Sequence, residues 1–329
     1  MSRAIEIAKN GLGTASPNPL VGCVLVHNDK ILGEGHHHVF GQAHAEVNAI
    51  ASVEEKKPLK ESSLYVTLEP CAHFGKTPPC ADLIVKNKIK RVFIGNQDPF
   101  SKVNGEGIRR LEQAGIEVHT GILDTECREM NRRFFTYLEE KRPYIILKWA
   151  QTADGFIARE NFDSKWISNE HSRQLVHKWR SEEDAILVGK NTVKYDNPSL
   201  TVRDWNGRNP VRVVVDHTLA LDMNFNTFDS SAKTIVLNTI QDQDFFFKYD
   251  GSIASLAARL YDQKIQSVIV EGGAKTLADF IESDLWDEAR IFTSEKTFKS
   301  GINAPTIMGD LKSELNVSGD NLRILRNVR

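Results

Sequence analysis

Apolar residues in the first 140 positions follow two patterns, short continuous runs and helical spacing. The runs are bounded by turn residues and predict strands, and the spaced segments between them predict helices. The predicted strands are 21–26, 31–35, 64–67, 91–94 and 116–119, and the predicted helices are 3–10, 45–52, 80–88, 105–114 and 124–138. Asn28-Asp29-Lys30 predicts a hairpin turn between the first two strands. Helices that alternate with near-parallel strands predict a layered α/β domain.

The chain changes character near residue 142. A charged stretch from Glu139 ends at Pro143, and an apolar strand begins at Tyr144. One hydrophobic core seldom exceeds about 250 residues, so a length of 329 residues also favours two domains. We therefore expect domains at 1–142 and 143–329.

One strand–turn–helix unit stands out in the second half. An apolar strand at 267–270 leads into Glu271-Gly272-Gly273 and a helix over 274–281. A glycine turn at a helix N-terminus presents N–H groups to an anion, such as a dinucleotide phosphate. Many such units bind nothing, and this one lacks Gly-x-Gly-x-x-Gly, so it does not indicate a Rossmann domain.

Composition narrows the functional classes. Hydrophobic residues make up 40% and charged residues 26%, which is typical of globular proteins, and the net charge of −2 gives no basic excess for nucleic acid. The sequence has no apolar run of about 18 residues and no signal-peptide core after Met1, so we expect a cytoplasmic protein that does not span a membrane. Four cysteines, two of them assigned to a metal below, do not predict a disulfide framework.

Residue types suited to metal chemistry gather between residues 44 and 80. His44, Glu46, Cys71 and Cys80 supply one imidazole, one carboxylate and two sulfurs. A catalytic zinc site uses three such protein ligands and keeps its fourth position open for water. His-x-Glu followed by Pro-Cys-x-x-Cys is typical of zinc deaminases, in which Glu transfers protons and is not a ligand. Here eight residues separate the cysteines. We predict zinc on His44, Cys71 and Cys80, with Glu46 as general acid and base.

Other interpretations of this segment remain open at this stage. His73 could close a structural zinc site, the cysteines could be buried without a metal, and Glu46 could be a solvated helix carboxylate. His36-His37-His38 looks like a metal tract, but consecutive residues of an extended segment point to alternating sides and cannot all reach one ion.

The longer cysteine loop makes the chain resemble a known family. Glu-Pro-Cys71-x-His-x-Gly-x-Thr-Pro-Pro-Cys80 after His-Ala-Glu46 resembles the bifunctional deaminase/reductases of riboflavin biosynthesis. Motifs of their reductase half follow, at 144–155, 188–203 and 270–276. The resemblance covers essentially the whole chain. It implies a cytidine-deaminase-like three-layer α/β/α domain followed by a dihydrofolate-reductase-like α/β domain.

The resemblance also implies substrate-binding residues in the deaminase half. Asn18 would bind the pyrimidine, His37 would contact the substrate, and Lys76 would contact its ribose or phosphate. From the residues alone, Asn18 between two prolines is also good turn chemistry. Lys76 alone reads as a surface lysine, and His73 could serve the loop or the substrate.

The reductase half would bind NADPH and a phosphoribosyl substrate. The resemblance implies that the NADPH site contains Ala150, Trp166, Thr192, Asp196, Gly273, Ala274, Lys275, Thr276, Leu277, Ala278 and Asp279. The substrate would contact Ser164, Arg180, Leu200, Arg203 and Glu271, with Lys148 as a further possible contact. Two arginines suit a phosphate monoester because a guanidinium binds it bidentately. Trp166 could equally be a core residue, and Asp196 before Asn-Pro could belong to a turn.

These expectations favour one function for the chain and leave two alternative functions open. The chain would deaminate 2,5-diamino-6-(5-phosphoribosylamino)pyrimidin-4(3H)-one with zinc, then use NADPH to form 5-amino-6-(5-phosphoribitylamino)uracil. It would form a homo-oligomer, a dimer or tetramer, as the family often does. The rivals are a nucleic-acid deaminase with an accessory domain and a zinc-stapled binding module, and a degenerate reductase half is a further alternative. The chain departs from the family pattern in two places, at His217 near the cofactor and at Gln42-Ala43 before the zinc histidine.

Overall fold

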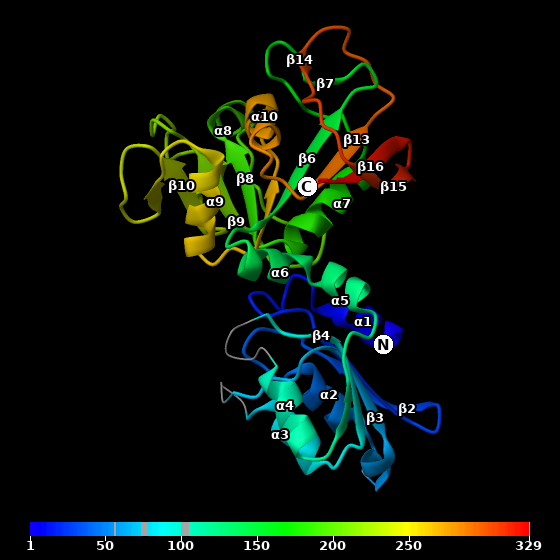
Figure 1. The fold of residues 1–329 in the computed structure, drawn as a ribbon. Coiled ribbons are helices and arrows are strands. Elements are labelled where there is room, and N and C mark those ends of the chain that lie inside the picture. The colour runs from blue at the N-terminus through cyan, green and yellow to red at the C-terminus, as the bar shows by residue number, and fades with distance from the viewer. Residues whose placement is uncertain (56, 74–77, 100–104, 329) are drawn as a thin grey trace. The chain divides into compact units, whose positions relative to one another are not determined.

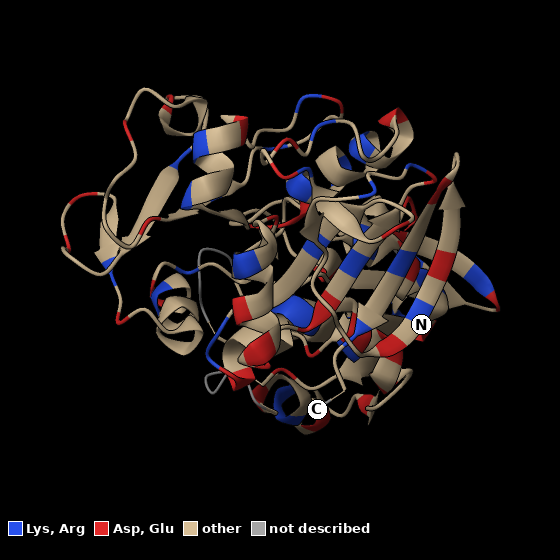
Figure 2. Cartoon of the chain, turned by 90° about the horizontal axis from the view of Figure 1, so that it is seen from above, with Lys and Arg blue, Asp and Glu red and all other residues tan. Residues whose placement is uncertain are grey.

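The chain folds into two compact units, residues Met1–Glu140 and Lys141–Arg329. The structure is a computed structural model that describes residues 1–55, 57–73, 78–99 and 105–328. Lysines and arginines are interspersed with acidic residues along the helices and strands (Figure 2). Within the described residues, no helix combines the length and the apolar character that a membrane span requires.

Unit 1 contains one five-stranded sheet in the order β2-β1-β3-β4-β5 (Figure 1). β1 is antiparallel to both β2 and β3, whereas β3, β4 and β5 are parallel. The elements are α1 (Ser2–Ala8), β1 (Gly22–His27), β2 (Lys30–His36), α2 (Ala45–Ser52), β3 (Ser63–Leu68), α3 (Cys80–Lys86), β4 (Arg91–Asn96), α4 (Glu106–Gln113), β5 (Glu117–His119), α5 (Asp124–Met130) and α6 (Arg132–Glu139), with 3-10 turns at Lys9–Gly11 and Lys57–Glu61.

Helices cover both faces of this sheet. One face packs against α2, α3 and α4 through Leu25, Ala49, Ile84 and Leu111. On the other face, α1 packs on Val24 of β1, α1 and α5 pack together, and α6 packs on the end of β3. The alternation of side chains along β1 divides the two cores. The predicted three-layer α/β/α fold is therefore confirmed.

Most predicted elements of unit 1 are present within one or two residues, and Asn28 and Asp29 have the positive φ of a tight hairpin turn. The single helix predicted over 124–138 is wrong, because the chain breaks at Asn131 into α5 and α6. The buried Asn131 amide pairs with both backbone groups of Leu20, at 2.8 Å each. This long-range pairing fixes a non-helical backbone that local spacing does not reveal.

Unit 2 contains a nine-stranded sheet in the order β11-β10-β9-β8-β12-β6-β13-β16-β15 and a separate β14-β7 pair. Strands from β11 to β13 run parallel, and β16 and β15 add an antiparallel edge. The elements are β6 (Tyr144–Gln151), β7 (Phe156–Ala158), α7 (Glu170–Glu182), β8 (Ala185–Gly189), α8 (Lys190–Asp196), β9 (Val211–Val215), β10 (Thr234–Asn238), β11 (Phe246–Lys248), α9 (Ile253–Asp262), β12 (Ser267–Val270), α10 (Ala274–Glu282), β13 (Glu288–Thr293), β14 (Ile302–Asn303), β15 (Asp310–Val317) and β16 (Asp320–Arg326), with a 3-10 turn at Asn226–Phe228.

The parallel strands of unit 2 are buried on both faces. One core contains Leu256 and Leu260 of α9 with Leu277 and Phe280 of α10, and the other contains Val176 of α7 and residues of α8. Helices on both faces leave the carboxyl ends of the strands as the edge at which loops gather. Ligands of open α/β sheets bind at this edge.

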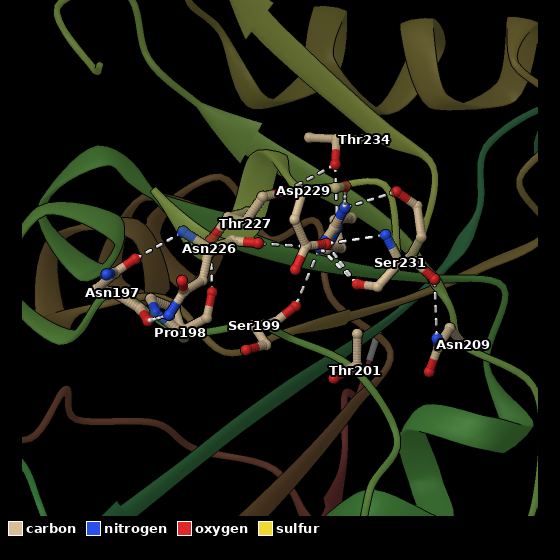
Figure 3. A network of polar contacts seen from close by, with 12 residues as sticks. Asn197, Pro198, Ser199, Thr201, Asn209, Asn226, Thr227, Asp229, Ser231 and Thr234 are labelled. Atoms are coloured by element: carbon tan, nitrogen blue, oxygen red, sulfur yellow. Dashed lines mark hydrogen bonds and ion pairs between the residues drawn. The ribbon is translucent and has the colours of Figure 1, made fainter. Parts of the chain in front are cut away.

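A buried arginine at the amino ends of β9 and β10 holds two adjoining segments of unit 2. Arg212 of β9 is fully buried and donates hydrogen bonds to the carbonyl oxygens of Ser199, Asn226, Asp229 and Ala232. Its guanidinium also pairs with the Asp229 carboxylate at 2.9 Å and with the Thr234 hydroxyl at 3.0 Å. Figure 3 shows that the labelled acceptors Ser199, Asn226, Asp229 and Thr234 come from two segments that are distant in the sequence. One side chain thus satisfies backbone groups that lie outside the α-helices and strands.

A buried glutamate has the same role in unit 1. Glu69 follows β3, and its carboxylate accepts hydrogen bonds from the N–H groups of Asp98, Gly105, Gly107 and Ile108, at 2.8 to 3.3 Å. Three of these groups open α4, where a negative charge also complements the helix dipole. Gly107 is required there, since a Cβ atom would lie 1.9 Å from the Pro70 carbonyl oxygen.

We expect Glu69→Gln to destabilise unit 1 by about 1–3 kcal/mol, because the amide turns a donor toward backbone N–H groups that then lack an acceptor. Urea unfolding of the full chain measures this change. The matched control is Glu54→Gln, an exposed carboxylate just beyond α2. Equal midpoints for both variants would contradict the structural role of Glu69.

Candidate active sites

Three predicted metal ligands meet in unit 1. His44 is the N-cap of α2, Cys80 is the first residue of α3, and Cys71 follows β3 by three residues. His44 Nδ1 lies 3.3 Å from Cys80 Sγ and 3.5 Å from Cys71 Sγ, and the three ligand atoms lie within 4.8 Å of one another. Ligands around a tetrahedral zinc would be about 3.6 Å apart for these bond lengths, so the donor set fits zinc. Among the described residues, this group contains no fourth ligand, and His73 is exposed.

Electrostatics in this group favour a thiolate. The hydrogen bond from the Cys80 thiol, supported by His44, lowers the pKa of Cys71 to about 4, and the Cys80 backbone N–H lies 3.3 Å from the Cys71 sulfur. In return, the hydrogen bond with Cys71 raises the pKa of His44. Thiolate and not thiol is the metal-binding form, so the group is prepared for a cation.

Glu46 lies in the first turn of α2 beside these ligands. Its side chain is only 3% exposed, so it is not a solvated helix carboxylate. Burial, and then the charge of Cys71, raise the pKa of Glu46 to about 7. A carboxyl group with this pKa can both accept and release a proton near neutral pH.

The structure places Asn18 and His37 together. His37 Nδ1 lies 3.0 Å from the Ala43 carbonyl oxygen, which can only accept, so Nδ1 carries the proton of the neutral ring. His37 Nε2 then accepts from the Asn18 amide at 3.0 Å, which orients the amide. The His37 ring meets the His44 ring edge-on, with 5.5 Å between centroids, whereas the His36 and His38 rings contact each other at a tilt of 44°. Lys76 lies outside the described residues.

Unit 2 has a large cavity at the carboxyl ends of its parallel strands, with a volume of about 1160 Å³. Most of the predicted cofactor and substrate residues line it: Lys148, Ala150, Ser164, Trp166, Arg180, Thr192, Asp196, Leu200, Arg203, Glu271, Gly273, Ala274, Lys275, Thr276 and Asp279. Leu277 packs in the core instead, and Ala278 is absent from the lining among the described residues. Leu277 lies on the side of α10 opposite to residues 275, 276 and 279, which face the cavity.

A buried charge cluster forms the floor of this cavity. Arg180 donates to both Glu271 carboxylate oxygens, at 3.0 and 2.9 Å, and Lys148 Nζ lies 3.4 Å from the same carboxylate. Burial alone would raise the pKa of Glu271, but the charges of Arg180 and Lys148 hold it at about 2. Burial lowers the pKa of Lys148, and Glu271 partly opposes this shift. The cluster keeps a net positive charge, which suits an anionic ligand.

The exposure of Trp166 decides one open alternative. Trp166 is 65% exposed, so it is not a core residue, and the Arg173 guanidinium lies 4.4 Å from its ring centroid. Asp196 accepts a hydrogen bond from Ser164 at 3.3 Å, which links α8 to the loop before α7. His217 lines the cavity and lies 3.1 Å from the Tyr249 hydroxyl.

Sequence reasoning missed two further cavity residues, Arg173 and His177. Both lie on α7 with Arg180, at spacings of four and three residues. This spacing places all three on one face of a helix. The signal was therefore present in the sequence as a basic helical face.

Comparisons with known proteins assign a family to each half. Residues 1–96 match the cytidine and deoxycytidylate deaminase zinc-binding region, and residues 143–324 match the RibD C-terminal domain. The riboflavin biosynthesis protein RibD of Aquifex aeolicus is 40% identical over 94% of this chain and 89% of its own length. RibD of Bacillus amyloliquefaciens is 39% identical over 100% of this chain and 90% of its own length.

Solved structures agree over the full length. A deaminase/reductase of Thermotoga maritima, described as a diaminohydroxyphosphoribosylaminopyrimidine deaminase and 5-amino-6-(5-phosphoribosylamino)uracil reductase, has a TM-score of 0.92 at 40% identity, covering 100% of this chain and 97% of its own. RibD of Acinetobacter baumannii has a TM-score of 0.92 at 31% identity, covering 100% and 98%. The chain therefore belongs to the RibD family and is a bifunctional enzyme of riboflavin biosynthesis, with a zinc-dependent deaminase and an NADPH-dependent reductase in one polypeptide.

Proposed function

We propose that residues 1–142 remove the 2-amino group of 2,5-diamino-6-(5-phosphoribosylamino)pyrimidin-4(3H)-one, and that residues 143–329 reduce the ribosyl chain of the product to ribityl. The single observation that carries the first step is the burial of Glu46 beside three convergent zinc ligands. The second step is supported by a cavity that combines a cationic floor with a glycine turn at the N-terminus of α10. Both steps act on a small molecule.

In the deaminase site, His44, Cys71 and Cys80 would hold the zinc. When bound, zinc supplies the electrophile that activates water for attack on the amino-bearing ring carbon. Glu46 would take a proton at its carboxylate and return protons to the ring nitrogen and to the leaving amine, which departs as ammonia. Asn18, held by His37, would orient the pyrimidine by hydrogen bonding. Lys76 is proposed to contact the ribose or phosphate.

In the reductase site, NADPH supplies the hydride that is added at the sugar's C1. Gly273 and the first turn of α10, with Ala150, Trp166, Thr192 and Asp196, would bind this cofactor, and Lys275 and Asp279 of the same helix would contribute to its site. Arg180 and Arg203 would bind the substrate phosphate, with Ser164 and Leu200 beside it. Glu271 would hold Lys148 near the sugar, where its ammonium could give the proton that the ring oxygen takes up as the ring opens.

We also propose that the chain forms a homo-oligomer in the cytoplasm. Exposed Met308, Leu311 and Leu315 on and near the edge strand β15 support self-association. The four cysteines are free, as is usual in a reducing compartment. The interspersed charges favour a small-molecule substrate over a nucleic acid (Figure 2).

Glu46→Gln should lower the rate of ammonia release at least about 100-fold, because the amide cannot carry the proton between water and the leaving amine. Zinc content and NADPH oxidation with added deaminated intermediate should stay at the wild-type level. Ammonia release and NADPH consumption, followed in parallel, measure both steps. Wild-type ammonia release by the variant would contradict the role of Glu46.

Cys71→Ser should remove zinc and deaminase activity together, since a serine hydroxyl is a poor zinc ligand at neutral pH. Atomic absorption gives the zinc content per chain. Cys127→Ala, which changes a buried cysteine outside the ligand group, should retain zinc and activity. Retention of a full zinc complement by Cys71→Ser would assign the metal to other ligands.

Glu271→Gln should reduce reductase kcat/KM at least about tenfold, because Lys148 and Arg180 lose the carboxylate that holds them in the cavity floor. Steady-state NADPH oxidation with the deaminated intermediate tests this expectation, and ammonia release should not change. Glu160→Gln, an exposed glutamate just after β7 that is not among the described cavity-lining residues, is the matched control. Equal reductase kinetics for the two variants would rule out a role for Glu271.

A further inference from the structure

One face of α7 forms part of the reductase cavity wall. Arg173, Val176, His177 and Arg180 all line the cavity, at the three- and four-residue spacing of one helical face. His177 is buried, although histidine is often exposed at least in part. A buried imidazole requires partners for both ring nitrogens.

The partners of His177 lie in an irregular segment. Residues 201–204 belong to no helix or strand, so side chains must satisfy their backbone groups. Arg180 donates to the Thr201 carbonyl oxygen at 3.4 Å, and the Asn209 side chain accepts from the Val202 N–H at 2.8 Å. The Arg203 backbone N–H lies 3.1 Å from His177 Nδ1. α7 therefore anchors this segment at two points.

The donor at Arg203 fixes the tautomer of His177. A backbone N–H can only donate, so Nδ1 is the acceptor and the ring proton is on Nε2. Nε2 lies 3.3 Å from the Asp204 carboxylate, whose negative charge faces this N–H group. Burial, with the charge of Arg180, lowers the pKa of His177 and so favours this neutral form. An imidazolium would turn a second donor toward the Arg203 N–H.

Arg203 itself has donors available for a ligand. It lines the cavity, and within the described chain its guanidinium makes one hydrogen bond, to the Thr201 hydroxyl at 3.3 Å. A guanidinium carries five N–H donors. Arg173, Arg180 and Lys148 line the same cavity, where Glu271 is the buried counter-charge. The excess of positive charge fits a phosphate monoester.

We propose that His177 is a positioning residue of the reductase: its neutral Nε2–H imidazole fixes the backbone of Arg203, and through it the guanidinium that binds the substrate phosphate. This inference rests on the proposed function, in which Arg203 contacts that phosphate. His177 acts through Arg203 and does not itself touch the reacting atoms. It therefore controls how well the substrate binds, and not the hydride transfer.

Two substitutions separate the hydrogen bond from the shape of the ring. His177→Phe keeps a ring but has no acceptor, whereas in His177→Asn the amide oxygen takes the place of Nδ1 and can accept from the Arg203 N–H. With 5-amino-6-(5-phosphoribosylamino)uracil as substrate, we expect His177→Phe to raise KM about tenfold and to change kcat less than about twofold. His177→Asn should restore KM to within about twofold of wild type.

NADPH affinity, measured by fluorescence titration, and ammonia release report on folding and should match wild type in every variant. If His177→Phe fails to bind NADPH, His177→Ala takes its place. Arg203→Gln should raise KM at least as much as His177→Phe, and the double variant should show no further increase. A multiplicative increase in the double variant, or equal KM values for the Phe and Asn variants, would overturn the proposal.

The same measurements test the phosphate contact of Arg203 and the positioning role of His177 separately. A wild-type KM for Arg203→Gln would remove the proposed phosphate contact and, with it, the role of His177. A raised KM for Arg203→Gln beside a wild-type KM for His177→Phe would leave the phosphate contact intact and overturn the positioning role alone.

Discussion

Both units connect their helices and strands through irregular segments, and this creates the constraint on which the structure depends: buried backbone groups of those segments still need hydrogen-bond partners. Buried polar side chains supply them. Glu69 accepts from four backbone N–H groups in unit 1, and Arg212 donates to four carbonyl oxygens in unit 2. Each of these residues is charged, so a single side chain can serve several groups of one polarity. His177 and Asn131 also bind backbone groups of irregular segments, but each serves a single residue, Arg203 and Leu20 respectively.

The two units place their sites in the same way although their chemistry differs. In unit 1, Cys71 follows the parallel strand β3, and His44 and Cys80 lie at the starts of α2 and α3. In unit 2, Glu271 follows β12, and the glycine turn leads into α10. Strand ends and helix starts present unpaired backbone groups and side chains at one edge of a sheet. In each unit the sheet and its helices form a rigid support for the site. The loops at that edge can therefore differ in sequence between the two units while the support stays the same.

Two buried glutamates differ in pKa because the charges around them differ. Glu46 is buried beside the Cys71 thiolate, and burial and this charge raise its pKa to about 7 and allow it to exchange protons. Burial acts in the same direction on Glu271, but the charges of Arg180 and Lys148 outweigh it and keep the carboxylate ionised, with a pKa of about 2. The first carboxyl group is suited to proton transfer and the second to holding cations in place. The same residue type therefore serves two functions because its neighbours differ in charge.

The sequence by itself determined the family, the α/β character of both halves, and the residue types that zinc and phosphate chemistry require, such as His44, Cys71 and Cys80. These follow from side-chain chemistry and from spacing within short segments, which are readable without a fold. Only the tertiary structure decided that the helix after Asp124 breaks at Asn131, that Leu277 faces the core, and that Trp166 is exposed. It also gave Glu69, Arg212 and His177 their partners. Each of these outcomes depends on atoms that are distant in sequence, such as Leu20 for Asn131, and local spacing carries no information about contacts that form only when the chain folds.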